Sequence, residues 1–154
     1  PAAPLSVIDG GRLVSYLHDS YTSGKESRAS TGNSSRGSGS WSFRNAPSIS
    51  TSNLVVGKGD SDFDEMVAET RSGVYLRGTW DYPNLATGEL SALMMESYVI
   101  RDGELGPALK QSTIGVGLVE MLSRVDMLGR SQRTFFGVTS PHMRISSARI
   151  GGSN

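Results

Sequence analysis

Two histidines, His18 and His142, are the side chains of this sequence best suited to acid–base or metal chemistry. His18 stands beside Asp19, an arrangement that suits a general base or a metal ligand. The second histidine lies far away in the sequence, and a zinc site usually takes three or four ligands. We therefore expect both histidines to be structural, and we keep as an alternative a metal-dependent peptidase that uses them with nearby carboxylates.

An acidic cluster formed by Asp60, Asp62, Asp64 and Glu65 superficially resembles a calcium-binding loop. An EF-hand loop needs glycine at its sixth position and a bidentate glutamate at its twelfth, where this sequence has Glu65 and Arg71. Negative charge is also favoured in the first turn of a helix, because of the helix dipole. The cluster therefore indicates the start of a helix and not a metal site.

Basic and aromatic side chains are mixed between Arg36 and Arg44, a stretch that includes Trp41 and Phe43. Proteins that bind single-stranded nucleic acid combine such residues. The whole chain, however, has 15 Lys and Arg against 15 Asp and Glu, so no net positive charge attracts phosphates. This balance argues against nucleic acid as a partner and favours a loop or a contact with another protein.

Length and composition set the remaining limits. The chain has 154 residues, the size of one domain, and its lack of cysteine excludes a thiol nucleophile, a disulfide and a thiolate metal ligand. No apolar run is long enough to cross a membrane and the start has no signal-peptide pattern, so we expect a cytoplasmic protein with no membrane partner. Because the sequence starts at Pro1 and not at methionine, we expect an excised or processed piece of a larger protein.

The elements that must position these residues begin with a hairpin. Pro4–Ile8 and Arg12–Leu17 are short apolar runs joined by Asp9-Gly10-Gly11, and Asp-Gly between such runs is typical of a hairpin. A helical turn is expected over Asp19–Gly24. Lys25–Ser52 is dominated by Ser, Gly and Thr, which predicts a long loop, and loops of this length in a compact domain are usually functional or mobile.

A short helix is predicted after Ser61, with Asp64 three residues later as in a capping box and Gly73 as its end. Leu118, Leu122 and Val125 predict an apolar face on a second helix. Strands are predicted over Asn53–Val56, Val74–Leu76, Leu90–Ile100, Leu105–Gln111, Arg133–Thr139 and His142–Ile150, with turns at Arg101-Asp102-Gly103-Glu104 and Ser140-Pro141. The sequence thus predicts a β-rich α+β domain over residues 1–154, with a mostly antiparallel sheet or barrel-like body, two short helices and a long Ser/Gly loop at about residues 25–52.

Several stretches together resemble the C-terminal part of the TldD/PmbA family, whose members are often labelled modulators of DNA gyrase. They follow one another in the family's order over nearly the whole chain. They are Ser30-Thr31-Gly32-Asn33 with Arg36, Pro47 with Ser52-Asn53-Leu54-Val55-Val56, Gly59-Asp60 with Asp64-Glu65-Met66, Gly73-Val74-Tyr75, Thr87-Gly88-Glu89-Leu90-Ser91, Tyr98-Val99-Ile100 with Gly103-Glu104, Pro107 to Lys110, Ile114-Gly115, and Pro141 to Ile145 before Gly151-Gly152.

The resemblance implies a zinc-dependent peptidase system that trims small proteins and peptide precursors. In such a family the active subunit carries an HExxxH motif on a helix of its N-terminal domain, and a cysteine of the C-terminal domain adds a further zinc ligand. A related inactive subunit completes a heterodimer. The bound zinc polarises the carbonyl and lowers the pKa of its water, and the glutamate moves the proton.

This chain departs from the family pattern at the catalytic positions. Glutamate follows neither His18 nor His142, and the region near Leu128-Gly129-Arg130, where the resemblance places a cysteine, has none. We therefore expect a domain closer to the non-catalytic PmbA-like partner, inactive alone and without a cofactor of its own, zinc being implied only for an active-type partner. Two alternatives remain: a divergent metallopeptidase whose metal-binding helix lies in a missing N-terminal part, and a DNA gyrase- or nucleic-acid-associated module.

The expected role is to hold substrate and to support the assembly. The partners would be a TldD-like protease subunit or the protein's own N-terminal domain, together with a peptide or small-protein substrate. The loop over residues 25–52 would line a channel or meet the partner, since its amide, hydroxyl and backbone groups suit an extended peptide. Thr31, Asn33 and Arg36 are the candidate contact residues, and no catalytic or metal-binding residue is assigned.

Overall fold

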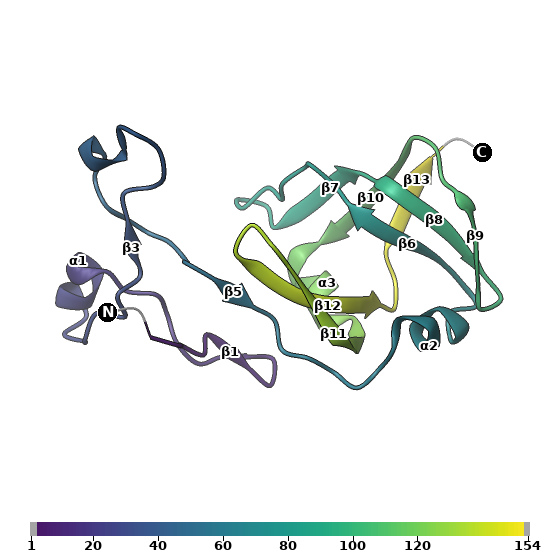
Figure 1. The fold of residues 1–154 in the computed structure, drawn as a ribbon, viewed down its shortest axis with the longest axis horizontal. Coiled ribbons are helices and arrows are strands. Elements are labelled where there is room, and N and C mark those ends of the chain that lie inside the picture. The colour runs from purple at the N-terminus through teal and green to yellow at the C-terminus, as the bar shows by residue number, and fades with distance from the viewer. Residues whose placement is uncertain (1–2, 153–154) are drawn as a thin grey trace. The chain divides into compact units, whose positions relative to one another are not determined.

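A computed structural model of the chain describes residues 3–152 (Figure 1). The described residues form two compact units. One consists of the residues up to Val55 together with Phe135–Val138, and the other of Val56–Thr134 and the residues from Thr139 on. No helix within residues 3–152 is long and apolar enough to cross a membrane.

The first unit consists of short elements joined by loops. Its elements are β1 (Ile8–Asp9), β2 (Arg12–Leu13), α1 (Ser20–Lys25), β3 (Ser34–Ser35), the 3-10 helix η1 (Ser42–Arg44), β4 (Ser48–Ile49) and β5 (Leu54–Val55). The predicted N-terminal hairpin is present but short, and it turns through Gly10 and Gly11, whose φ angles are 53° and 76°. The stretch predicted as a long loop contains only the two-residue ladder of β3 with β4 and the single turn of η1.

The helical turn expected near Asp19 is confirmed as α1. The Asp19 carboxylate accepts a hydrogen bond from the Thr22 N–H at 2.7 Å, and the Thr22 hydroxyl accepts one from the Asp19 N–H at 3.1 Å. These reciprocal bonds satisfy amide groups that would otherwise lack partners at the start of a helix. The bond from the Thr22 N–H, together with one that the Thr22 hydroxyl donates to the same carboxylate at 2.8 Å, lowers the pKa of Asp19.

The second unit contains the longer strands and the core. Its elements are α2 (Phe63–Ala68), β6 (Ser72–Gly78), β7 (Glu89–Leu93), β8 (Met95–Arg101), β9 (Glu104–Ala108), β10 (Ser112–Gly117), α3 (Leu118–Ser123), β11 (Val125–Phe135), β12 (Val138–Ile145) and β13 (Arg149–Gly152). Antiparallel sheets have the strand orders β6-β8-β9 and β13-β10-β7, and β11 pairs with β12 in a hairpin. The tip of this hairpin, Phe135–Val138, belongs to the first unit, where the Leu54 N–H donates to the Gly137 carbonyl at 2.8 Å.

The described core lies in the second unit and combines side chains of α2 with alternate positions of the strands. Its buried hydrophobic residues are Met66, Val67, Ala92, Met94, Ile100 and Val116. Regular alternation would place every second side chain on the core face, but in β8 the buried residues Ser97 and Ile100 are three positions apart, because the register shifts between Tyr98 and Ile100. The β-rich α+β class predicted from the sequence is thus confirmed, with open sheets of two or three strands.

The predicted start of α2 was one residue early. The helix begins at Phe63 with Asp62 as its cap, and the Glu65 carboxylate accepts a hydrogen bond from the Asp62 N–H at 3.2 Å. A capping pair of Ser61 with Asp64 was therefore wrong, because the longer Glu65 side chain reaches back where Asp64 does not. The helix also ends at Ala68, and Gly73 lies inside β6.

Several predicted strand boundaries were wrong, and two of the errors concern how the strands pair. Leu90–Ile100 is divided at Met94 into β7 and β8, which belong to different sheets, and Glu96 has a left-handed φ of 49°. The turn between the last two long strands falls at Phe136 and Gly137, with φ angles of 44° and 77°, and Ser140-Pro141 lies inside β12. The sequence hides this turn because phenylalanine rarely takes a left-handed conformation.

The apolar face predicted for the second helix is only partly buried. Leu118 is half-buried, Leu122 is 61% exposed, and Val125 is half-buried and begins β11. On the same helix Glu120 forms an ion pair with Arg124, four residues later, with a nitrogen–oxygen distance of 2.7 Å. The turn expected near Asp19 is a short α-helix, so residues 3–152 contain three α-helices where two helices and one turn were predicted.

Candidate functional site

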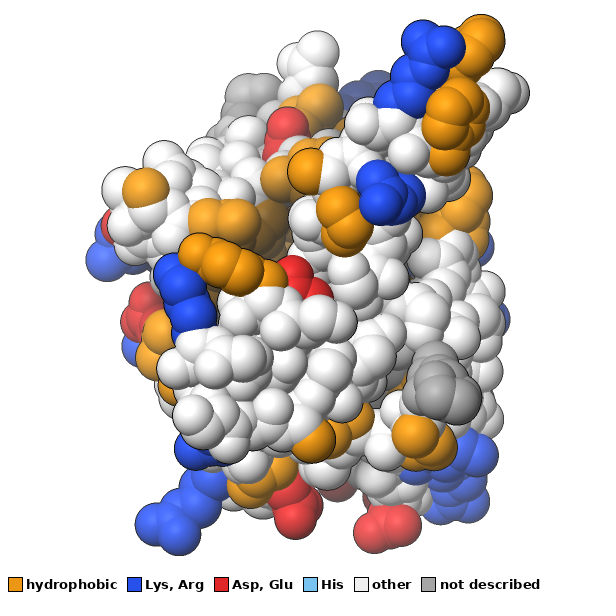
Figure 2. All heavy atoms as spheres, turned by 90° about the vertical axis from the view of Figure 1, so that its left-hand side faces the viewer, with side chains coloured by type: hydrophobic (Ala, Val, Ile, Leu, Met, Phe, Trp, Pro, Cys, Tyr) orange, Lys and Arg blue, Asp and Glu red, His pale blue; other side chains and the backbone are white. Residues whose placement is uncertain are grey.

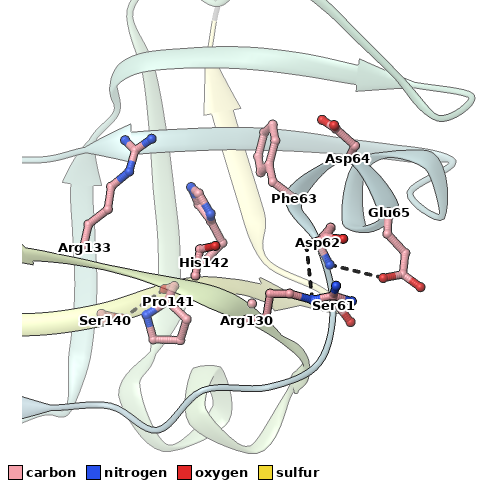
Figure 3. A pocket seen from close by; sticks show the side chains of 12 residues that line it. Ser61, Asp62, Phe63, Asp64, Glu65, Arg130, Arg133, Ser140, Pro141 and His142 are labelled. Carbon is pink, nitrogen blue, oxygen red and sulfur yellow. Dashed lines mark hydrogen bonds and ion pairs between the residues drawn. The ribbon is translucent and has the colours of Figure 1, made fainter.

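A cavity of the second unit has a volume of about 780 Å³ and lies between the start of α2 and the β11–β12 hairpin (Figure 3). Its lining combines carboxylates, guanidinium groups, an imidazole, hydroxyls and an aromatic ring. The lining residues are Ser61, Asp62, Phe63, Asp64, Glu65, Gly129, Arg130, Ser131, Arg133, Ser140, Pro141 and His142.

The wall of this cavity depends on a close backbone contact between two segments. Ser61 pairs with Gly129 in a parallel bridge, the Gly59 N–H donates to the Gly129 carbonyl at 3.1 Å, and the Ser61 N–H donates to the Leu128 carbonyl at 3.2 Å. A Cβ atom at Gly59 would lie 2.2 Å from the carbonyl oxygen of Leu128. Only glycine at position 59 permits this approach, so it fixes where the entry to α2 lies against β11.

Arg130 reinforces the same contact. Its guanidinium donates to the Asp60 carbonyl at 3.1 and 2.7 Å and lies 3.3 Å from the Asp62 carboxylate. The Glu65 carboxylate accepts a hydrogen bond from the N–H of Asp62, the N-cap residue of α2. Asp62, Glu65 and Arg130 therefore have local structural partners, and the acidic cluster marks the start of a helix, as the sequence predicted.

His142 lies within a group of aromatic rings on one side of the cavity. Its ring centroid is 4.9 Å from that of Phe63, and its Nε2 atom is 3.4 Å from the Tyr75 hydroxyl. Phe63 and Tyr75 are themselves in contact, with ring centroids 4.7 Å apart. Burial and the nearby positive charge of Arg133 lower the pKa of His142. The imidazole is thus neutral at neutral pH and offers one donor and one acceptor.

Arg133 and Asp64 differ from the other charged residues of the cavity. Within residues 3–152, neither side chain forms an ion pair or a hydrogen bond with another residue. Figure 3 shows Arg133 on β11 at one side of the cavity and Asp64 and Glu65 on α2 at the other, with His142 and Phe63 between them. Sequence reasoning did not single out Arg133, because only the β11–β12 hairpin brings it near His142.

His18 lies in the first unit and is 5% exposed. Among the described residues neither of its ring nitrogens has a hydrogen-bond partner, and its Nε2 atom is 3.9 Å from the Glu26 carboxylate. No three His, Asp or Glu side chains within residues 3–152 lie close enough together to hold a metal ion. The alternative of a metal centre built from His18, His142 and carboxylates therefore has no support in this part of the chain.

The predicted contact residues Thr31, Asn33 and Arg36 all lie in the first unit. The Thr31 hydroxyl accepts from the His18 N–H at 2.7 Å and donates to the His18 carbonyl at 3.0 Å. The Arg36 guanidinium donates to the carbonyl oxygens of Phe43 and Asn45, so it stabilises the conformation of the loop to which it belongs. Thr31 and Arg36 thus shape the segment, whatever else they contact.

Asn33 is the exception among the three, since its side-chain oxygen is buried and has no partner among the described residues. It lines a cavity of about 310 Å³ together with Gly32, Ser34, Ser35 and the segment from Ser50 to Ser52. An unpaired buried oxygen is unfavourable by about 1–3 kcal/mol. A hydrogen-bond donor from a ligand or from water would remove that penalty.

The loop after β3 exposes two aromatic rings next to an arginine. Trp41 is 66% exposed and Phe43 is 62% exposed, and the Arg44 guanidinium lies 4.4 Å from the centroid of the Trp41 ring. Figure 2 shows hydrophobic side chains interspersed with Lys and Arg on the face of the molecule that it presents. The mixed basic and aromatic character predicted for this stretch is therefore displayed to solvent.

Comparison with known proteins defines the class. The family described as the PmbA/TldA metallopeptidase C-terminal domain matches residues 1–152. The chain belongs to this family, which confirms the resemblance found in the sequence.

Relatives in the family are named metalloproteases. One from Methanothermobacter thermautotrophicus is 29% identical over 99% of this chain, and one from Methanocaldococcus jannaschii is 31% identical over 78%. The matched regions cover 35% and 26% of those proteins, so this chain spans about a third or less of their length.

Solved structures share the fold at low sequence identity. TldE from Thermococcus kodakarensis is 20% identical, with a TM-score of 0.86 over 99% of this chain and 34% of that one. A putative modulator of a DNA gyrase from Thermotoga maritima is 23% identical, with a TM-score of 0.82 over 98% of this chain and 33% of that one.

The zinc ion that the family implies does not fit the residues that the structure describes. Leu128, in the region where the resemblance places a cysteine, has an aliphatic side chain with no donor atom. The neighbouring Asp62 is paired with Arg130, and residues 3–152 contain no group of three possible ligands. A zinc site would need donors from outside the described residues.

Proposed function

We propose that this domain holds extended peptides or small proteins for a TldD/PmbA-type metalloprotease assembly and does not supply the catalytic groups itself. The observation that carries the proposal is the cavity beside Gly129 and Arg130. The residue before them is Leu128 and not a metal-binding cysteine, yet the adjacent cavity is large and rich in hydrogen-bonding groups.

The chemistry of the cavity favours binding over bond cleavage. A neutral His142 and the hydroxyls of Ser131 and Ser140 suit the amide groups of a peptide, while Phe63 offers an apolar surface. Within residues 3–152, no serine or threonine hydroxyl is hydrogen-bonded to a histidine ring, so this part of the chain contains no paired nucleophile and base.

The loop over residues 25–52 is proposed as a second contact region, for a TldD-like protease subunit or for the protein's own N-terminal domain. Asn33 supports this proposal because its unpaired oxygen can accept from a backbone amide of the partner. Thr31 and Arg36 would act in the same contact by holding the loop in shape, and the exposed Trp41 and Phe43 would add apolar area.

Peptide binding is tested by fluorescence anisotropy of labelled, unstructured peptides titrated with the chain, with mass spectrometry of the same samples. The proposal expects saturable binding without cleavage, both with added zinc and with a chelator. His142→Gln should weaken binding, while Arg149→Gln, an exposed change outside the cavity, should not. Cleavage by the chain alone that requires zinc would overturn the proposal, and so would a complete lack of binding.

The loop contact is tested by limited proteolysis of the chain with and without a TldD-like subunit. Protection of sites within residues 25–52 is the expected result. Cutting at the same rate in both samples would count against the loop as a contact. Asn33→Ala should reduce the protection if its side-chain oxygen accepts a bond from the partner, and Asn84→Ala is a control outside the first unit.

A further inference from the structure

The charged groups of the large cavity are separated by sign. Arg133 on β11 occupies one side, Asp64 and Glu65 on α2 occupy the other, and the Phe63 and His142 rings lie between them (Figure 3). The cavity therefore has a polarity that the zero net charge of the whole chain conceals.

The groups that carry this polarity are available to a ligand. Arg133 and Asp64 are both exposed, and within residues 3–152 neither side chain has an ion-pair or hydrogen-bond partner. Arg130 is a useful contrast, because its guanidinium already bonds the Asp60 carbonyl and pairs with Asp62. Two arginines line one cavity, and only Arg133 remains open to a new carboxylate.

The middle of the cavity suits an uncharged group. The Phe63 ring contacts both Tyr75 and His142, with centroid separations of 4.7 and 4.9 Å. Burial and the nearby Arg133 both lower the pKa of His142, so the imidazole presents a polar but uncharged surface. An apolar or aromatic side chain of a ligand could pack on these two rings, because neither ring carries a charge that would need a charged partner.

We propose that the cavity selects peptide segments by the order of their charges. A carboxylate of the peptide pairs with Arg133, an apolar residue covers Phe63 and His142, and a basic side chain pairs with Asp64 and Glu65. This inference rests on the proposed peptide-holding function and gives it a substrate class: segments with acidic and basic groups separated by an apolar residue. The carboxylate can belong to an acidic side chain or to the C-terminus of the peptide.

The test compares labelled peptides that differ only in their end groups and in the number of residues between them. One series has an acidic residue, an apolar centre and a basic residue, and two others replace both charged residues with glutamine or with two acids. At low salt, each ion pair formed with the protein should make the charge-separated peptides bind about fivefold more tightly than the neutral ones. At high salt this difference in affinity should shrink. Free and amidated C-termini, compared without the acidic side chain, show which carboxylate Arg133 prefers.

Exchanged charges on the protein give the decisive comparison. A chain with both Arg133→Glu and Asp64→Lys should lose its preference for the original charge-separated peptide. It should instead favour the peptide in which the acidic and basic residues are exchanged and the chain direction is unchanged. Arg133→Gln alone should remove the acid-end preference and leave the basic-end preference. Arg149→Glu, on the exposed strand β13, should change neither, and circular dichroism checks that each variant is folded.

The outcomes separate the two levels of the proposal. Equal binding of the charge-separated, neutral and all-acidic peptides would overturn charge selection while leaving peptide holding intact. Binding of no peptide at all would overturn both. A preference that persists in the charge-exchanged chain would place peptide recognition elsewhere and overturn the role of Arg133 and Asp64.

Discussion

The Arg144 guanidinium donates to both carboxylate oxygens of Asp126, and each nitrogen–oxygen distance is 3.0 Å. Arg144 also lies 3.4 Å from the carboxylate of Glu69, the residue that caps the C-terminal end of α2. One side chain of β12 thus connects β11 with the helix that borders the large cavity. The hydrogen bonds between them, together with their opposite charges, lower the pKa of Asp126 and raise that of Arg144.

Asp126→Asn should destabilise the fold by about 1 kcal/mol, because a two-bond pair on a partly exposed surface lies at the upper end of the range for such pairs. The folded-state pKa of Asp126 is below its unfolded value, so its contribution is complete above about pH 4 and is lost as the pH falls through the depressed pKa. Thermal unfolding of both proteins followed by circular dichroism checks this. The two curves should differ at neutral pH and converge in acid; a constant difference would contradict the ionic origin.

His142 should make stability rise with pH in a window below the ordinary histidine pKa of about 6.5. Its folded-state pKa is lowered, so between the folded and unfolded values the unfolded chain binds more protons. His142→Gln should remove this part of the pH dependence. NMR titration of the imidazole should also show its pKa rising in Arg133→Gln and staying unchanged in Arg149→Gln. No response to Arg133→Gln would mean that burial alone lowers this pKa.

Gly59→Ala should destabilise the second unit by about 2 kcal/mol or more, because the added methyl group would meet the Leu128 backbone, which cannot move away easily. Gly57→Ala is the matched control, since a Cβ atom there meets nothing within 4 Å. Chemical denaturation of the two variants measures the difference. Equal stabilities would show that the segment from residue 59 to residue 61 does not lie against β11 in solution.

Zinc should not bind at one equivalent to this chain, nor to its Leu128→Cys variant. A single thiolate adds one donor, and residues 3–152 have no group of three other side chains arranged to complete a site. Elemental analysis after dialysis without chelator, followed by zinc titration, measures the stoichiometry. One tightly bound zinc per wild-type chain would show that the ligand assignment is wrong, and His18 and His142 would be the first residues to substitute.

The sequence predicted local features well where one residue type determines the conformation. Asp102 and Gly103 form the second hairpin turn as predicted, with φ angles of 47° and 82°. The prediction of the last turn from the sequence was wrong. Phe136 takes a left-handed conformation that its side chain does not favour, so the sequence placed this turn at Ser140-Pro141. Tertiary pairing overrides local preference at such a position.

The candidate site was less predictable than the fold. His142 and Asp64 were both noticed, but each was interpreted alone, and Arg133 had no distinguishing neighbour in the sequence. The cavity exists because the segment after Gly59 runs beside Leu128 and Gly129, almost 70 residues later in the chain. No local pattern encodes that contact, whereas the order of the family motifs identified the domain without it.

The exposed indole of Trp41 has a practical consequence for spectroscopy. The chain has two tryptophans, and Trp80 is also exposed, at 71%. Both indoles are already in water in the folded protein, so unfolding should shift their emission very little. Burial by a docking protein would shift it to shorter wavelengths. The intrinsic fluorescence of this domain should therefore serve as an optical probe of association and a poor one of denaturation.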